Sequence, residues 1–86
     1  MQYTLSPHAE QELVRRGIPR EALEEVLACP QQIVPGYRGR TVFQSQLAFG
    51  DGKLFLVRAI VDQRLSPALV LTVYRTSKIA KYWQQP

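Results

Sequence analysis

The sequence predicts an α+β domain in which an N-terminal helical hairpin packs on an antiparallel sheet of three or four strands. Near the start of the chain, two stretches that each open with a proline carry apolar residues at the spacing of one helix face. From residue 31 onward the chain is rich in β-branched and aromatic residues that alternate as they do in strands. The 86 residues suffice for one small domain, so we expect residues 1–86 to form a single unit.

The two helices are predicted from the residues at their ends. Ser6 is a suitable cap for the first helix, which we expect from Pro7 to about Arg16, with Gly17 as its left-handed stop. The second helix is expected from Arg20 to about Ala28, where Cys29-Pro30 ends it. Its buried stripe contains Ala22, Leu23, Val26 and Leu27.

The remaining elements are strands separated by turn residues. We expect strands at Gln31–Val34, Thr41–Phe49, Leu54–Val61 and Leu69–Tyr74. The sequence Gly50-Asp51-Gly52-Lys53 predicts a hairpin turn between the second and the third. Alternation along the last strand puts Leu69, Leu71 and Val73 on a core face, and Val70, Thr72, Tyr74 and Thr76 on the other.

The later part of the chain carries the net positive charge. Residues 1–25 contain three basic and five acidic residues, a net charge of −2, whereas residues 26–86 contain eight basic and two acidic residues, a net charge of +6. The basic part is a candidate footprint for a polyanion such as RNA, although a solvated basic surface has the same composition.

Composition also argues against several classes of protein. No apolar run approaches the ~20 residues of a membrane span, and no signal-peptide pattern opens the chain. The single cysteine, Cys29, excludes an internal disulfide framework. We therefore expect a cytoplasmic protein that does not associate with membranes.

Neither a metal site nor a cofactor site is expected. The chain has no cluster of His and Cys, its two aspartates stand alone in turns, and no glycine-rich phosphate loop is present. The remaining options are acid–base chemistry without metal or cofactor, or binding without chemistry.

The best candidate site combines the last two strands. If they pair through the connection between them, Arg58 falls near Thr72 and shares a face with Tyr74. A guanidinium and a phenol directed at one spot suit a phosphodiester, because both stabilise the charge that develops on the phosphate. The alternative is that Arg58 extends to solvent at the sheet edge and that Tyr74 is ordinary packing.

His8, the only histidine, is a candidate general acid or base near neutral pH. The alternative is a structural histidine hydrogen-bonded at a helix start. Glu12, one turn later, is expected to hold the imidazole in either case.

Both ends of the chain resemble a known family. The residues that carry the resemblance to domain-of-unknown-function family 4258, a family of small bacterial proteins, are Ser6-Pro7-His8-Ala9, Arg16-Gly17-Ile18-Pro19 and Pro30, then Thr72-Val73-Tyr74, Lys78 and Lys81-Tyr82. That family commonly has an arginine one turn after the histidine, where this chain has Glu12. The departure implies either that an activity of that arginine is lost or that Arg15 or Arg16 substitutes for it.

More distantly, the chain resembles the RelE/ParE-like toxins of bacterial toxin–antitoxin pairs. The resemblance implies two N-terminal helices on an antiparallel sheet and, for RelE-like members, RNA cleavage without metal by basic and aromatic residues on the sheet and near the C-terminus. ParE-like members act on gyrase instead. The resulting hypothesis is a metal-independent endoribonuclease, a toxin held by a cognate antitoxin protein.

In this hypothesis a 2′-hydroxyl of RNA attacks the adjacent phosphate. Arg58 and Lys78 neutralise the phosphate charge and Tyr74 or His8 transfers the proton, which makes these four the expected catalytic residues. The expected RNA-binding residues are Arg15, Arg16, Arg75, Lys81 and Tyr82, and Trp83 offers a further ring for stacking on bases.

Two other functions fit the same sequence. One is a non-catalytic module that binds nucleic acid or a protein, which needs only the basic part and the exposed aromatic rings. The other is a homodimer joined through an apolar sheet face, with Phe49, Leu54 and Phe55 as its anchors.

Overall fold

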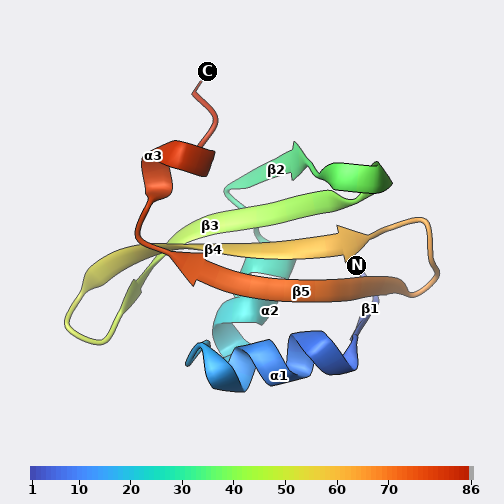
Figure 1. Cartoon of the computed structure of the whole chain (residues 1–86), viewed down its shortest axis with the longest axis horizontal. Helices are drawn as coiled ribbons and strands as arrows, with labels where there is room; N and C mark the ends of the chain where they lie inside the picture. Colours follow the sequence, from blue (N-terminus) through green and yellow to red (C-terminus); the bar gives the residue numbers. More distant parts are fainter. Residues whose placement is uncertain (86) are drawn as a thin grey trace.

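The fold is built on one five-stranded sheet (Figure 1). The structure is a computed structural model, and it describes residues 1–85. In chain order the elements are β1 (Tyr3–Leu5), α1 (Pro7–Arg15), α2 (Arg20–Ala28), β2 (Gln32–Pro35), the short 3-10 helix η1 (Tyr37–Gly39), β3 (Thr41–Phe49), β4 (Lys53–Asp62), β5 (Ala68–Thr76) and α3 (Ile79–Tyr82). The strands lie side by side in the order β1-β5-β4-β3-β2.

The predicted fold class is wrong in two respects. The sheet has five strands rather than three or four, and it is mixed, because β1 runs parallel to β5 while the other neighbours pair antiparallel. The helices do not pack as a hairpin, since α1 contacts mainly β5 and β1, and α2 contacts β4 and β3. The fold is therefore a sheet-dominated α+β structure with short helices.

Strand β1 is the element that changes the class. It has only three residues, too few to show alternation, and its partners Ala68–Val70 lie near the other end of the chain. The Ser6 N–H donates to the Val70 carbonyl at 3.0 Å, and the Ala68 N–H donates to the Gln2 carbonyl at 3.2 Å. These long-range bonds have no local sequence signal.

The predicted caps and turns are confirmed. Ser6 Oγ accepts from the Ala9 N–H at 3.0 Å, Gly17 is left-handed with φ of 60°, and the β3–β4 turn has positive φ at both Gly50 and Gly52. Ser6 Oγ also donates to the Leu71 carbonyl at 2.8 Å, which fixes the start of α1 on β5. Within residues 1–85, none of the helices has the length and apolar character needed to cross a membrane.

A β-bulge changes which residues of β5 face the core. Ile60 pairs with Thr72 and Val61 pairs with Val70, so Leu71 is an extra residue in β5. The expected alternation is therefore wrong before residue 72. Val70 is fully buried in the core, whereas Leu71 lines a hollow on the opposite face.

The main core lies between the sheet and the two long helices. It contains Leu13, Leu23, Val26 and Leu27 from the helices and Phe43, Val57, Ala59, Val61, Val70 and Val73 from the sheet. The alternate residues of β3, β4 and β5 point to the other face of the sheet. The chain returns over that second face as α3, where the sequence predicted only a basic tail.

Candidate functional site

Four side chains meet on the sheet face opposite α1 and α2, and we name them the Arg58 cluster: Gln44, Arg58, Tyr74 and Tyr82. The Nε of Arg58 donates to Gln44 Oε1 at 2.8 Å, and its Nη1 donates to Tyr74 Oη at 2.6 Å. The guanidinium carbon lies 4.2 Å from the centroid of the Tyr82 ring, in cation–π contact. The two hydrogen bonds fix the guanidinium plane and use two of its five N–H groups.

The strand register brings three of these residues into line. Gln44 pairs with Arg58, and Arg58 pairs with Tyr74. The predicted register put Arg58 near Thr72, but Thr72 pairs with Ile60 instead. Because this error is two residues, it leaves Arg58 and Tyr74 on the predicted face.

Two glutamines that the sequence analysis did not select hold the cluster in place. Gln44 is fully buried, and its Nε2 donates to Gln32 Oε1 at 2.8 Å and to the Tyr82 carbonyl at 3.3 Å. Gln32 exchanges hydrogen bonds with the main chain of Gln84, at 2.7 and 3.1 Å. A glutamine in an alternating strand suggests a solvent-facing position. Counting back from the Gly50–Gly52 turn would have placed Gln44 opposite Arg58.

The two phenols of the cluster titrate differently. The rings of Tyr74 and Tyr82 meet edge to face, with centroids 6.3 Å apart. Burial raises the pKa of Tyr74, although the hydrogen bond from Arg58 acts in the opposite direction. The Lys81 ammonium lowers the pKa of Tyr82. Tyr82 therefore ionises at lower pH than Tyr74.

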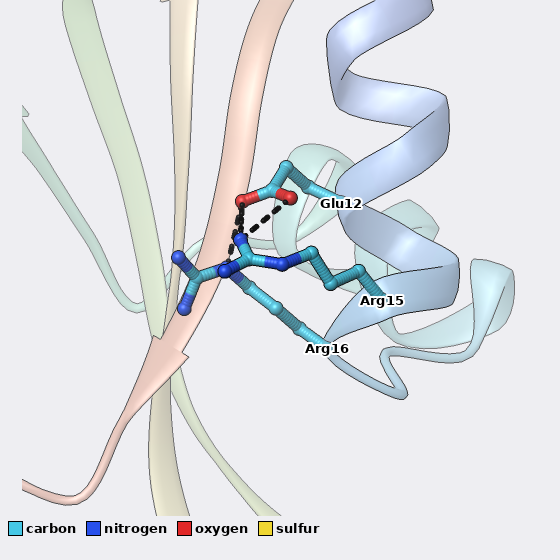
Figure 2. A network of polar contacts seen from close by, with 3 residues as sticks. All are labelled: Glu12, Arg15 and Arg16. Atoms are coloured by element: carbon cyan, nitrogen blue, oxygen red, sulfur yellow. Dashed lines mark hydrogen bonds and ion pairs between the residues drawn. The ribbon is translucent and has the colours of Figure 1, made fainter.

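The residue that departs from the family pattern, Glu12, is buried beside β5 and holds two arginines (Figure 2). The Nη1 of Arg15 donates to both Glu12 oxygens, at 3.2 and 3.1 Å, and the Nε of Arg16 donates to one at 2.9 Å. The bond from Arg16, followed by that from Arg15, lowers the pKa of Glu12. The guanidinium carbon of Arg16 lies 5.9 Å from the Tyr74 ring centroid, so Arg16 borders the cluster. Arg15 is exposed.

The structure does not bring His8 or Lys78 into the cluster. His8 is exposed in the first turn of α1, and about 12 Å of helix separates it from Arg16, the α1 residue nearest Tyr74. Lys78 is exposed just before α3. Lys81 is exposed too, but its Nζ lies 5.2 Å from the Tyr82 ring centroid.

Arg75 lies on the helix-bearing face of the sheet, away from the cluster. Its guanidinium carbon sits 4.6 Å from the ring centroid of Phe49 and 4.7 Å from that of Phe55. These two rings contact one another with centroids 5.6 Å apart. Leu54 points from the opposite face of β4, so the three predicted dimer anchors do not share one face.

A hollow of about 420 Å³ adjoins the Arg58 cluster on the same face and is partly walled by Arg58 and Tyr74. A second hollow, of about 490 Å³, lies beside the start of α2 and the end of β3, but Glu21 and Glu25 line it. Two carboxylates repel an anion, so the hollow beside the cluster is the better candidate site for a ligand that carries phosphate.

Within residues 1–85, the His, Cys, Asp and Glu side chains form no group of three that would hold a metal ion. The groups available at the cluster are a guanidinium, two phenols and an amide. Such groups bind phosphate and transfer protons.

Comparison with known proteins identifies a family. Neither a curated protein nor a solved structure gives a significant match. The family model described as "Domain of unknown function (DUF4258)" matches residues 5–75, which hold every member of the Arg58 cluster except Tyr82. The first of the two resemblances seen in the sequence is confirmed, and the chain belongs to the DUF4258 family.

Proposed function

We propose that the protein is a metal-independent endoribonuclease whose active site is the Arg58 cluster. The observation that carries the proposal is a guanidinium fixed between two phenols whose pKa values move in opposite directions. Where the environments of two titratable groups separate their pKa values, the groups are suited to act as base and acid. Tyr82 is therefore the base and Tyr74 the acid.

The reaction is a transesterification within the RNA. The Tyr82 phenolate takes the proton of a 2′-hydroxyl, and that oxygen forms a bond to the adjacent phosphorus. The bond from phosphorus to O5′ of the next nucleotide breaks, and Tyr74 gives its proton to the leaving O5′. The products are a 2′,3′-cyclic phosphate and a 5′-hydroxyl, and the two phenols regain their starting protonation by exchange with water.

Arg58 has two roles in this reaction. Its free N–H groups donate to the non-bridging phosphate oxygens as negative charge accumulates there. Its bond to Tyr74 Oη leaves the Tyr74 hydrogen available to the leaving group, and it stabilises the phenolate that remains. The second role offsets the burial that would otherwise disfavour ionisation of Tyr74.

The test is cleavage of a 5′-labelled RNA by purified protein in the presence of EDTA. We expect products that end in a 2′,3′-cyclic phosphate, and no cleavage of an RNA with deoxyribose at the cut site. Arg58→Lys keeps the charge but loses the fork that binds Gln44 and Tyr74, so the rate should fall by roughly 100- to 1,000-fold. Arg20→Lys, an exposed change on α2, is the matched control and should retain the wild-type rate.

Binding of RNA without cleavage is the second candidate function. It is favoured by the Tyr82 ring, which lies on the guanidinium of Arg58. The bonds from Arg15 and Arg16 to Glu12 also leave neither arginine free to take the place of the arginine that the family commonly has. In the same assay this function predicts a salt-sensitive complex with intact RNA. Absence of both binding and cleavage contradicts both functions.

The proposed biological setting is a toxin restrained by an antitoxin protein. Induced expression in a bacterium that lacks the antitoxin should stop growth and fragment cellular RNA. Arg58→Lys, expressed to the same soluble level, should do neither. Normal growth with abundant soluble wild-type protein contradicts the toxin proposal.

A further inference from the structure

The hollow beside the Arg58 cluster has the composition of a nucleoside site. Its lining combines apolar side chains of the sheet with polar and aromatic ones, among them Tyr37, Arg40 and Thr72. It extends along the sheet from the cluster to η1, whereas α3 lies near the other end of β3 (Figure 1). Its volume of about 420 Å³ lies within the range of small-ligand sites, which combine an apolar lining with a few convergent polar groups.

The apolar part of the lining comes from three neighbouring strands. Val42, Ile60 and Leu71 belong to β3, β4 and β5, and Leu71 is present there because of the bulge in β5. The polar part comes from Thr72 and Arg40, with Arg58 and Tyr74 at the boundary with the cluster. An aromatic base fits the apolar part, and a phosphate or ribose hydroxyl fits the polar part.

Arg40 has an unused donor. Its Nε is buried and has no hydrogen-bond partner, and it is the one such side-chain nitrogen or oxygen within residues 1–85. The nearest carboxylate, on Asp62, lies 4.0 Å from that Nε and is already bound by the Nε and Nη2 of Arg64, each at 3.0 Å. A buried donor without a partner costs free energy, so the guanidinium is not at its most stable position. The part of the Arg40 side chain that remains exposed, 28%, is what an anion in the hollow would contact.

The loop before Arg40 presents an aromatic ring at the rim of the hollow. Tyr37 is 93% exposed, an unusual state for a tyrosine. The loop is closed by bonds from the Gly36 N–H to the Arg40 carbonyl at 2.8 Å and from the Arg40 N–H to the Tyr37 carbonyl at 3.0 Å. Arg38, in the left-handed conformation at φ of 56°, completes this turn. The ring is therefore held on a fixed backbone, as a stacking surface requires.

We infer that this hollow binds the nucleotide of the RNA next to the scissile phosphate. The base lies on the apolar lining and under Tyr37, and a phosphate oxygen of that nucleotide accepts from Arg40. The ligand class is a ribonucleoside 5′-monophosphate unit. The assignment to a nucleotide beside the cut bond rests on the proposed function, whereas binding of the nucleotide itself does not.

The test is titration of the wild-type protein with the four ribonucleoside 5′-monophosphates, followed by the methyl NMR signals of Val42, Ile60 and Leu71. We expect these signals to shift with at least one nucleotide and to shift far less with inorganic phosphate or with the nucleoside. Arg40→Gln should weaken nucleotide binding at least tenfold. Arg38→Gln removes the same charge from an exposed neighbour and should change it less than twofold.

Thermal stability and cleavage kinetics test the same site independently. Arg40→Lys keeps a cation beside Asp62 and should match the wild-type thermal midpoint while still binding the nucleotide less tightly. If RNA is cleaved, Arg40→Gln should raise KM and leave kcat unchanged, because the residue lies outside the Arg58 cluster.

The inference is overturned if the methyl signals do not respond to any nucleotide, or if Arg38→Gln weakens binding as much as Arg40→Gln. Failure of the proposed function gives a different result. In that case nucleotides bind in the hollow and depend on Arg40, but no RNA is cut.

Discussion

The two faces of the sheet are built from the same strands but are stabilised in different ways. On the face covered by α1 and α2, Val57, Ala59 and Val73 are fully buried among apolar side chains. On the other face their neighbours Arg58 and Tyr74 are linked by directional hydrogen bonds under α3. Apolar burial tolerates small shifts, whereas a polar network depends on every partner.

Alternate residues of one strand thus serve the apolar core on one face and the polar Arg58 cluster on the other. Substitutions on the helix-bearing face should change the free energy of unfolding and leave the chemistry of the folded protein intact. Substitutions on the opposite face should change chemistry more than stability. Five predictions bear on this division, and the largest expected effect comes first.

Leu23→Ala should destabilise the protein by about 2–5 kcal/mol, because it creates a cavity in the core beneath α2. Urea unfolding measures the change. At a temperature where the variant stays folded, its cleavage rate should equal that of the wild type. A slower rate with unchanged stability would break the division between the two faces.

The cleavage rate should depend on pH through the two phenols. The pKa of Tyr82 is lowered from 10.0 and that of Tyr74 is raised from 10.0, so the rate should rise to a plateau that begins below pH 10. It should fall again only above pH 10, as Tyr74 loses its proton. Single-turnover rates from pH 6 to 11 measure this profile.

Tyr82→Phe should remove the rising limb and lower the rate by roughly 100-fold, the usual contribution of a general base. Tyr3→Phe is the matched control, because Tyr3 lies in β1 away from the cluster. An unchanged profile in Tyr82→Phe would assign the base to another group.

Glu12→Gln should strengthen RNA binding by roughly twofold to tenfold, because it removes the carboxylate that neutralises Arg15 and Arg16 and leaves their charges available to phosphate. The salt dependence of binding should become steeper as well. Glu24→Gln makes the same charge change on the exposed side of α2 and serves as the control. Equal effects from the two variants would show that only net charge matters.

Asp62 should stabilise the fold in a limited range of pH. Its pKa is lowered from 3.8 to about 2, chiefly by the hydrogen bond from Arg64. A carboxylate whose pKa is lower in the folded state contributes full stability above pH 3.8 and loses it as the pH falls toward 2. Thermal midpoints from pH 5 to 2 should therefore fall more steeply for the wild type than for Asp62→Asn. Parallel curves would contradict this assignment.

Local chemistry made much of the fold predictable. The cap at Ser6, the left-handed Gly17 and the turn at Gly50–Gly52 depend on neighbouring residues, and all three are confirmed. The short strand β1 and the bulge at Leu71 depend on contacts between distant segments, which no local pattern encodes. Those two features caused the errors in fold class and in the β5 faces.

The candidate site divides in the same way. Alternation along two strands was enough to place Arg58 and Tyr74 on one face, because a register error of two residues preserves the face. Gln44 was not predicted as a site residue because it is α3 that covers its side chain. That helix has only four residues and was not predicted from the sequence. For the loop that carries Tyr37 and Arg40, the sequence predicted only the end of a strand.

Gln32 links the edge strand of the sheet to the assembly of the Arg58 cluster. Strand β2 has four residues, lies at an edge and ends in a proline, so it is among the segments that open most readily. When it frays, Gln32 leaves both Gln44 and Gln84, and the segment that carries Tyr82 loses its anchor. The lifetime of the assembled cluster is then set by the opening rate of a strand that contributes no member of the Arg58 cluster.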